Sequence, residues 1–432
     1  MIKKTNYKKY LFCAAIFSLM PLRPGSSADL SANNWTVDGE MSANYRGIGR
    51  TEAEVEVENQ LYVSDIYFSF NKPSETRLPK FIEFTMDLES KPVINQFYLN
   101  YAKIEKFFLT LGKSMIPFGR GNEIYKQSDF LSITRPLPYS SPQSLDFIAR
   151  LNIAQPVMAS GFADLGIIAT MLPKAEKAYV PSRIDLYVSN GFAENPLRGR
   201  GFPRAEGLGE PRQQGGVLAD YGHEQTTLAD NNDTKMAGGR VRFAIGDLRI
   251  PFLPEGIHLN GAQIGFSGFT NKYDVEDRLD QRVFGTDFVF QYDRYSITGE
   301  YIIVPMMNYR IARSSSVADR DEQPLPIHNE RLRGYYVSTA LNLPRWFYGT
   351  DTYLFMGISS MMREGEQMAT DAWKNYTFIR DTAPRIKRTI SKYTIGTRSK
   401  IKDFHFKVEY SYWNLSLVTD IYQWAVSSVV RF

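Results

Sequence analysis

Three observations predict an all-β protein, a transmembrane antiparallel β-barrel of about 16 strands. Segments of about ten residues alternate between apolar and polar side chains along most of the chain. The links between these segments are alternately short and long. The chain ends on one such segment, residues 422–432, whose last residue is the aromatic Phe432. Together these patterns indicate short periplasmic turns, long extracellular loops and strands with one face toward lipid.

The alternation shows which side chains share a face, because successive residues of a strand point to opposite sides. In the last segment Tyr422, Trp424 and Val426 alternate with Gln423 and more mixed residues. The same pattern recurs at 35–45, 82–89, 287–292 and 404–410, where the polar positions include full charges. A soluble sandwich would also bury its apolar face. Charges on strand after strand favour a water-filled lumen instead.

We expect strands near sixteen places along the chain. They are 34–45, 55–70, 80–89, 94–103, 107–113, 151–163, 183–192, 237–246, 257–269, 283–292, 295–304, 334–342, 351–361, 388–398, 403–412 and 422–432. Two of these are open to question. Residues 162–172 compete with 151–163 for the sixth place, and 55–70 alternates poorly.

The connections support a barrel. Short links at 104–106, 293–294 and 399–402 are separated by long ones, which are rich in Gly, Pro and charge. The long links are 114–150, 193–236, 305–333 and 362–387. A compact soluble domain tolerates few structureless loops above about 15 residues.

The N-terminus is typical of a secretory signal peptide. Four lysines, from Lys3 to Lys9, precede an apolar stretch that ends near Leu22, and small residues place the cleavage after Ala28. We therefore expect a signal peptide at 1–28 and a barrel at 29–432. The mature chain would lack the single cysteine, Cys13, which excludes a disulfide scaffold and a thiol nucleophile.

Charge argues against nucleic acid as a partner. Without the leader, Lys plus Arg falls from 51 to 46, against 47 acidic residues, so the net charge changes from +4 to −1. A basic surface that would attract a polyanion is therefore not expected.

Residues 111–119, Leu-Gly-Lys-Ser-Met-Ile-Pro-Phe-Gly, resemble the phosphate-selective porin O and P family, in which a strand runs into a Pro-Phe-Gly turn. Shorter similar pieces lie at 187–192, 285–288 and 334–337. The resemblance implies a sixteen-stranded homotrimeric porin whose third loop folds into the lumen. Family members selective for phosphate line the channel with a ladder of cations. Here the strand positions give six inward bases against nine inward acids, which is not such a ladder.

Candidate solute contacts come from the wall and from the third loop. On the wall, Arg240 and Arg242 flank Val241, so both should point into the channel and offer a step for anions. The other wall candidates are Arg388, Lys392 and Arg398. The alternative for all five is pairing with acids of neighbouring strands.

In the loop 114–150 the candidates are Arg120, Lys126 and Arg135. If this loop folds inward, they lie at the narrowest point, where low-dielectric walls strengthen their field. The alternative is a loop that caps the barrel and is exposed to solvent.

We do not expect an enzyme, a cofactor or a metal site. His405 shares a face with Asp403, as a pair for water activation would require, but both follow the short 399–402 link at the periplasmic end. The acidic runs 230–233 and 319–322 lack the spacing of an EF-hand.

The function predicted from the sequence is passive diffusion of small polar or charged solutes, anions such as phosphate among them, across the bacterial outer membrane. The alternative is a plugless sixteen-stranded receptor for uptake of an iron chelate (a siderophore). Expected partners are outer-membrane lipid and lipopolysaccharide, the barrel-assembly machinery through Phe432, two further copies of the chain and the solute itself.

Overall fold

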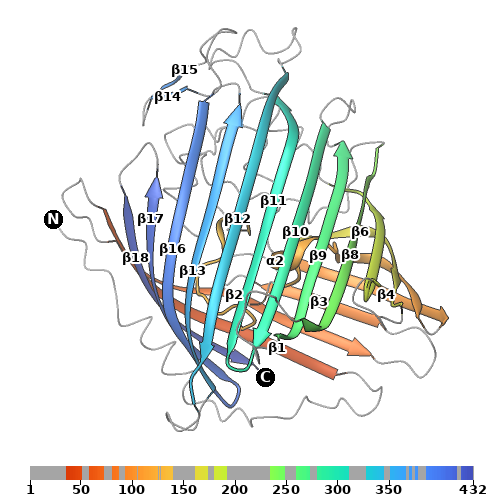
Figure 1. The fold of residues 1–432 in the computed structure, drawn as a ribbon, viewed down its shortest axis with the longest axis horizontal. Helices are drawn as coiled ribbons and strands as arrows, with labels where there is room; N and C mark the ends of the chain where they lie inside the picture. Colours follow the sequence, from red (N-terminus) through yellow and green to blue (C-terminus); the bar gives the residue numbers. More distant parts are fainter. Residues whose placement is uncertain are drawn as a thin grey trace.

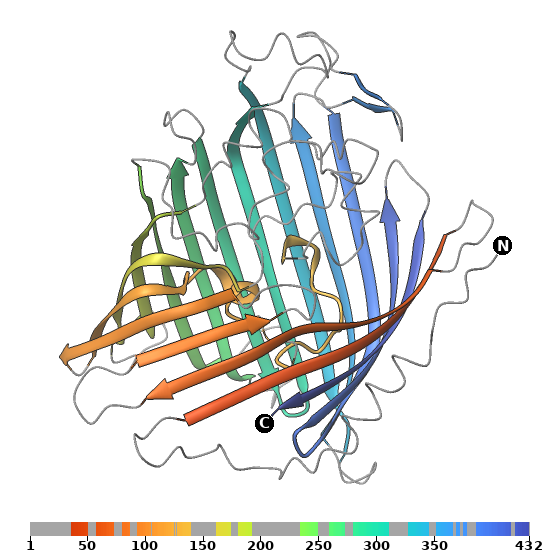
Figure 2. The same ribbon diagram turned by 180° about the vertical axis from the view of Figure 1, so that it is seen from behind.

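The computed structural model describes a closed antiparallel β-barrel (Figures 1 and 2). The described residues are 36–50, 58–72, 80–86, 93–104, 106–124, 126, 128–139, 161–173, 180–191, 234–248, 259–272, 280–310, 327–344, 351–365, 369–371, 375–377, 386–415 and 420–431. The predicted signal peptide and Phe432 lie outside them.

Sixteen strands form the barrel, and neighbours along the chain pair with each other throughout. They are β1 (Thr36–Arg50), β2 (Glu58–Lys72), β3 (Lys80–Met86), β4 (Val93–Ile104), β5 (Phe107–Met115), β6 (Ala163–Met171), β7 (Arg183–Ser189), β8 (Met236–Leu248), β9 (Leu259–Lys272), β10 (Asp280–Tyr292), β11 (Tyr295–Arg310), β12 (Ile327–Asn342), β13 (Asp351–Gly365), β16 (Ile386–Ile401), β17 (Phe404–Leu415) and β18 (Ile421–Arg431). The first and last strands close the cylinder, with Ala43 opposite Ser428.

A few elements lie outside the barrel wall. Strands β14 (Ala369–Asp371) and β15 (Asn375–Thr377) form a separate two-stranded sheet in the link between β13 and β16. The link between β5 and β6 contains the short helix α2 (Gly119–Glu123) and the 3₁₀ turn η1 (Leu137–Tyr139). Within the described part of the chain, no helix has the length and apolarity needed to cross a bilayer.

The predicted alternation of faces is confirmed. On β17, Phe404 and Phe406 are exposed on the outside, while His405 and Lys407 are buried inside. On β18, Trp424 is exposed outside and its neighbours are buried. The outside of the barrel carries exposed apolar side chains, and the closed sheet leaves no strand edge with unpaired backbone groups. A β-protein needs both features to lie in lipid.

One predicted strand is wrong. The sixth barrel strand is β6, the segment that competed with 151–163, and it pairs directly with β5 through Gly112 and Gly166. Residues 151–160 lie outside the described part of the chain. The poorly alternating segment 55–70 does supply a barrel strand, β2.

Two of the expected short links are tight turns at the same end of the barrel, the lower end in Figure 1. Asp293 and Lys402 begin them with φ of 48° and 54°, the left-handed conformation that such two-residue hairpins need. The link between β5 and β6 instead turns inward, and its contacts define the candidate site.

Candidate functional site

The described residues of 116–139, here called the inner segment, lie inside the barrel (Figure 2). Helix α2 contacts β9, β10 and β11. Farther along the segment, Ser128 hydrogen-bonds to Glu40 of β1, and Ile133 hydrogen-bonds to Glu409 of β17. A single segment can contact these separated strands only by crossing the interior.

Asn122 holds the beginning of the inner segment. Its side-chain Nδ2 donates to the carbonyl oxygen of Ile116 at 2.7 Å, and its Oδ1 accepts the backbone N–H of Phe162 at 2.7 Å. The backbone N–H of Ile116 donates to the Phe162 carbonyl oxygen at 3.0 Å. Because Asn122 is fully buried, these bonds satisfy polar groups that would otherwise be costly to bury. They also join the start of the segment to the residue that precedes β6.

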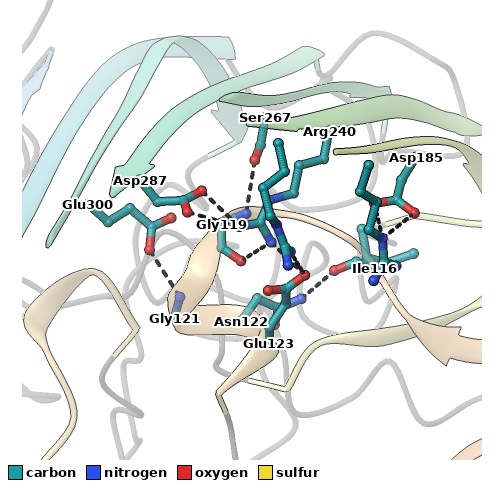
Figure 3. Close-up of polar contacts among 12 residues, drawn as sticks. Ile116, Gly119, Gly121, Asn122, Glu123, Asp185, Arg240, Ser267, Asp287 and Glu300 are labelled. Atoms are coloured by element: carbon teal, nitrogen blue, oxygen red, sulfur yellow. Dashed lines mark hydrogen bonds and ion pairs between the residues drawn. The ribbon is translucent and has the colours of Figure 1, made fainter. Parts of the chain in front are cut away.

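Arg240 of β8 joins the helix to the wall (Figure 3). Its Nη2 lies 3.0 and 2.9 Å from the two carboxylate oxygens of Asp287, and its Nη1 donates to the carbonyl oxygen of Gly119 at 2.8 Å. Nη1 is also 2.7 Å from Oε1 of Glu123, which Arg242 contacts as well. The two arginines that the sequence placed side by side therefore meet on one carboxylate of the inner segment.

Glu300 of β11 holds the other side of α2. It accepts the backbone N–H of Gly121 at 3.0 Å and the Tyr139 hydroxyl at 2.5 Å. Ser267 accepts the backbone N–H of Gly119 at 3.0 Å. A Cβ on Gly119 or Gly121 would collide with Glu300 or with the Tyr139 ring, so this close approach requires glycine.

Charged residues of β17 hold the middle of the segment against the opposite wall. The carboxylate of Glu409 accepts the backbone N–H groups of Ile133 and Thr134, at 2.5 and 3.1 Å. The ammonium group of Lys407 donates to the carbonyl oxygens of Phe130 and Ser132, at 2.6 and 3.2 Å.

Further contacts complete the series around the wall. On β16, Lys392 donates to the Arg135 carbonyl oxygen at 3.1 Å and to the Thr134 hydroxyl. Lys126 lies 3.1 Å from Glu83 of β3.

The contacts between the wall and the inner segment follow one pattern across the described interior. Wall carboxylates accept N–H groups of the inner segment, and wall cations donate to its carbonyl oxygens. Charge-assisted hydrogen bonds of this kind are stronger than neutral ones. The wall charges therefore fix the position of the segment, and the polar interior that the sequence predicted is buried beneath it at these positions.

Two titratable groups of the segment respond to this environment. Burial alone would raise the pKa of Glu123, but attraction to Arg240, Arg242 and Arg183 outweighs it, so the pKa lies below its usual value. Complete burial, reinforced by the neighbouring Glu300 carboxylate, raises the pKa of Tyr139 well above its usual value. At neutral pH Glu123 is ionised and Tyr139 is a hydroxyl donor.

The predicted wall residues fall into two groups. Arg240, Arg242 and Lys392 make contacts of the bracing kind, with carboxylates or with the inner segment. Arg398 lies apart from them, and its Nη2 is 2.8 Å from Nδ1 of His405. Arg388 belongs to β16, and its side chain is outside the described ones.

The three loop candidates differ in their surroundings. Arg120 lies on α2 and is half-buried, and its Nε atom has no hydrogen-bond partner among the described residues. Arg135 places its guanidinium 4.7 Å from the centre of the Phe130 ring. Lys126 is paired with Glu83. The structure does not bring these three side chains together on one anion.

Sequence reasoning missed the residues that hold the segment in place. The strand pattern put Glu40, Glu300 and Glu409 on the inner face but treated them only as a balance of charge. Asn122 and Tyr139 had no distinguishing pattern at all. Their partners lie far away in sequence, and no local periodicity predicts such pairs.

Two further expectations concern catalysis and metals. His405 lies against the guanidinium of Arg398, which is a hydrogen-bond donor and cannot orient the ring as a catalytic carboxylate would. Within the described ranges, no group of three or more His, Cys, Asp or Glu side chains is placed to hold a metal ion.

No protein-family model matches the chain, and no curated protein matches it in sequence. Solved structures do match. OmpTdeltaL8, a loop L8 deletion mutant of the outer membrane protein OmpT of Vibrio cholerae, aligns at 11% identity with a TM-score of 0.51. The alignment covers 92% of this chain and 100% of that one. The in-vitro folded OmpT of the same organism aligns at 11% identity with a TM-score of 0.50, over 93% of this chain and 99% of that one.

The fold is that of an outer-membrane β-barrel. The likeness extends over nearly the whole of both chains, so it includes the strands on all sides of the cylinder. Together with the exposed apolar exterior, it identifies the wall as a surface that faces lipid in the bacterial outer membrane.

Proposed function

We propose that this protein is a porin through which small polar or charged solutes diffuse passively. The observation that carries the proposal is a closed barrel whose interior is crossed by a segment held to both walls by charged side chains. Such a segment narrows the lumen and sets a size limit, while charged groups beside the passage bias the choice of ion.

We further propose a weak preference for anions and not a specific phosphate channel. A phosphate ladder requires cations that are available to the solute in series. Arg240, Lys392 and Lys407 are almost completely buried and donate to groups of the barrel and the inner segment. The half-buried Arg120 and Arg135 are the favoured solute contacts, because both lie on the segment that narrows the lumen.

Reversal potentials in a salt gradient test this selectivity. Replacing both Arg120→Ala and Arg135→Ala should reduce the anion-to-cation permeability ratio, since two positive charges leave the narrow region. Arg294→Ala is the matched control, because Arg294 is an exposed arginine in a tight turn at the end of the barrel. An unchanged permeability ratio in the double variant would show that Arg120 and Arg135 do not determine the ion selectivity.

Assembly is proposed to depend on the C-terminal aromatic residue. Strand β18 closes the barrel against β1 and presents Tyr422 and Trp424 to the outside, and Phe432 follows directly after it. Deleting Phe432 should lower the amount of folded barrel in the outer membrane several-fold, as measured by surface labelling. A truncated chain at normal surface levels would contradict recognition of Phe432 by the assembly machinery.

Three copies of the chain are proposed to associate, as the resemblance to trimeric porins implies. The mass of the detergent-solubilised complex measures this directly.

A further inference from the structure

The outer faces of β10, β11 and β12, which lie side by side at the front of Figure 1, change character sharply along their length. From the end with the tight turns upward, the outward residues are uncharged. They are Phe290, Phe288, Thr286 and Phe284 on β10, Ile297, Gly299, Tyr301 and Ile303 on β11, and Leu341, Thr339, Val337 and Tyr335 on β12. Directly beyond them come three exposed arginines, Arg282, Arg331 and Arg333, here called the rim patch.

The pairing of the strands places the rim patch in one small area. Phe284 lies opposite Ile303, which lies opposite Arg333. Arg282 is two residues above Phe284, and Arg331 is two residues above Arg333. Strands β10 and β12 are separated by one strand, so they are roughly 10 Å apart. Arginine side chains can span that gap from both sides.

The height of the rim patch matches the edge of a bilayer core. Arg333 and Leu341 are eight residues apart on β12, which is roughly 26 Å along an extended strand. A strand tilt of about 40° reduces this to roughly 20 Å along the membrane normal, close to the apolar band of about 25 Å in such barrels. The patch therefore lies where hydrocarbon ends, on the side opposite the tight turns, which the loop lengths of the sequence predict to be the extracellular side.

Among the described side chains of this face, two acidic residues lie near the rim patch, and each is paired across the sheet with a cation. Asp280 lies opposite Lys272, and Glu364 lies opposite Arg331. The residues opposite Arg282 are Thr270 and Met306, and those opposite Arg333 are Ile303 and Met362. Two arginines of the patch thus have uncharged neighbours on both adjoining strands.

We propose that the rim patch binds the phosphate groups of lipopolysaccharide in the outer leaflet. The proposal rests on the proposed function, an outer-membrane porin, and on the expectation from the sequence that its short turns face the periplasm. A guanidinium group presents two parallel N–H donors that match a phosphate. Exposed aromatic rings lie directly below the patch, at Phe284, Tyr301 and Tyr335. Aromatic side chains are common at this depth, where acyl chains meet headgroups. The charge of the patch and the apolar band beneath it fit a phosphorylated lipid.

Native mass spectrometry of the detergent-solubilised full-length protein tests this binding. The probe is diphosphoryl lipid A, compared with lipid A of the same acyl chains from which both phosphates have been removed. The wild type should retain the phosphorylated lipid at least ten-fold better than the dephosphorylated one. The triple variant Arg282→Gln, Arg331→Gln, Arg333→Gln should lose that difference, and the Arg294→Gln control should keep it.

Four results would overturn the proposal. One is equal retention of both lipids by the wild type, and another is full retention by the triple variant. The third is a change of oligomeric state in the triple variant, which would assign the patch to a contact between copies of the chain. The fourth is displacement of the lipid by millimolar inorganic phosphate, which would indicate a site for free phosphate. Channel conductance should stay unchanged in the triple variant. Conductance therefore tests the proposed porin function, and lipid retention tests the rim patch, so failure of one can be distinguished from failure of the other.

Discussion

At the scale of single residues, Arg240 shows how the interior is stabilised. Its guanidinium is buried among two carboxylates and a backbone carbonyl oxygen, all within 3.0 Å. Breaking a buried pair by removing one partner typically costs about 3–5 kcal/mol, because the other charge is left uncompensated. Asp287 would be that charge in this protein. The arginine therefore stabilises both the wall and the inner segment.

The strand pattern predicted the direction of such residues but not their partners. Arg240 had to point inward because Val241, next to it, belongs to the outer face. Nothing local indicated that its partner would be Glu123, which lies in another part of the chain. The choice between a solute contact and a brace depends on that partner, so the sequence alone left both open.

Glu123 gives a prediction about pH. Its pKa in the folded protein is below the usual value of 4.5, so its ionised form stabilises the folded arrangement at neutral pH. That stabilisation is complete above the unfolded pKa and is lost as the pH falls through the folded one. We expect proteolytic cleavage within residues 116–139 to stay constant at neutral and mildly acidic pH and to increase only as the pH falls below the usual carboxyl pKa of 4.5.

The control for this prediction is Glu123→Gln, which cannot ionise. This variant should show the increased cleavage already at neutral pH, and its cleavage should depend less on pH than that of the wild type below pH 4.5. Identical pH profiles for the variant and the wild type would show that Glu123 does not hold the segment.

At the scale of elements, most strands were predictable because a period of two is a local property of the sequence. The sixth strand was not, because its inner face carries Gly166 and the apolar Ile168, which blur the alternation. The competing segment 151–163 contains Pro156, which cannot donate to a strand ladder. The strand prediction did not use this proline, and the pairing with β5 assigns the sixth place to β6.

The inner segment depends on the fit of α2 against the wall, which gives a second prediction. Gly121→Ala would place a methyl group into the Tyr139 ring. Overpacking of this kind typically costs about 1–3 kcal/mol. We expect the variant to have a lower midpoint temperature of unfolding than the wild type. Samples heated to a series of temperatures and run on a denaturing gel measure it, because the folded barrel migrates as a compact band and the unfolded chain as a slower one.

Gly357→Ala is the matched control for this prediction. The atom nearest to its new methyl group would be the Ser338 hydroxyl, at 3.1 Å, and that side chain can move aside, while the Val337 carbonyl oxygen lies at an ordinary contact distance of 3.5 Å. If both variants unfolded at the same temperature as the wild type, close packing of α2 would not stabilise the protein.

At the scale of the whole molecule, the interior resembles a packed core more than an open pipe. Phe118 and Leu137 of the inner segment belong to one buried apolar cluster with inward residues of the wall. Those on β10 to β18 are Val283, Ile302, Val304, Leu332, Tyr336, Met361, Ile390, Trp413 and Ile421. The alternation rule assumes a wet lumen and did not predict them. Apolar contacts thus reinforce the charged ones in holding the inner segment inside the barrel.

Single-channel conductance in planar bilayers tests most directly whether the barrel is a pore narrowed by its inner segment. The wild type should insert with discrete conductance steps. Arg240→Gln should give larger or noisier steps, because it removes the contacts of Arg240 with Gly119 and Glu123 and so loosens the inner segment. A correctly folded wild-type barrel without any steps would contradict the account and favour a closed receptor for an iron chelate. Equal, steady steps in both proteins would show that the segment does not limit the current.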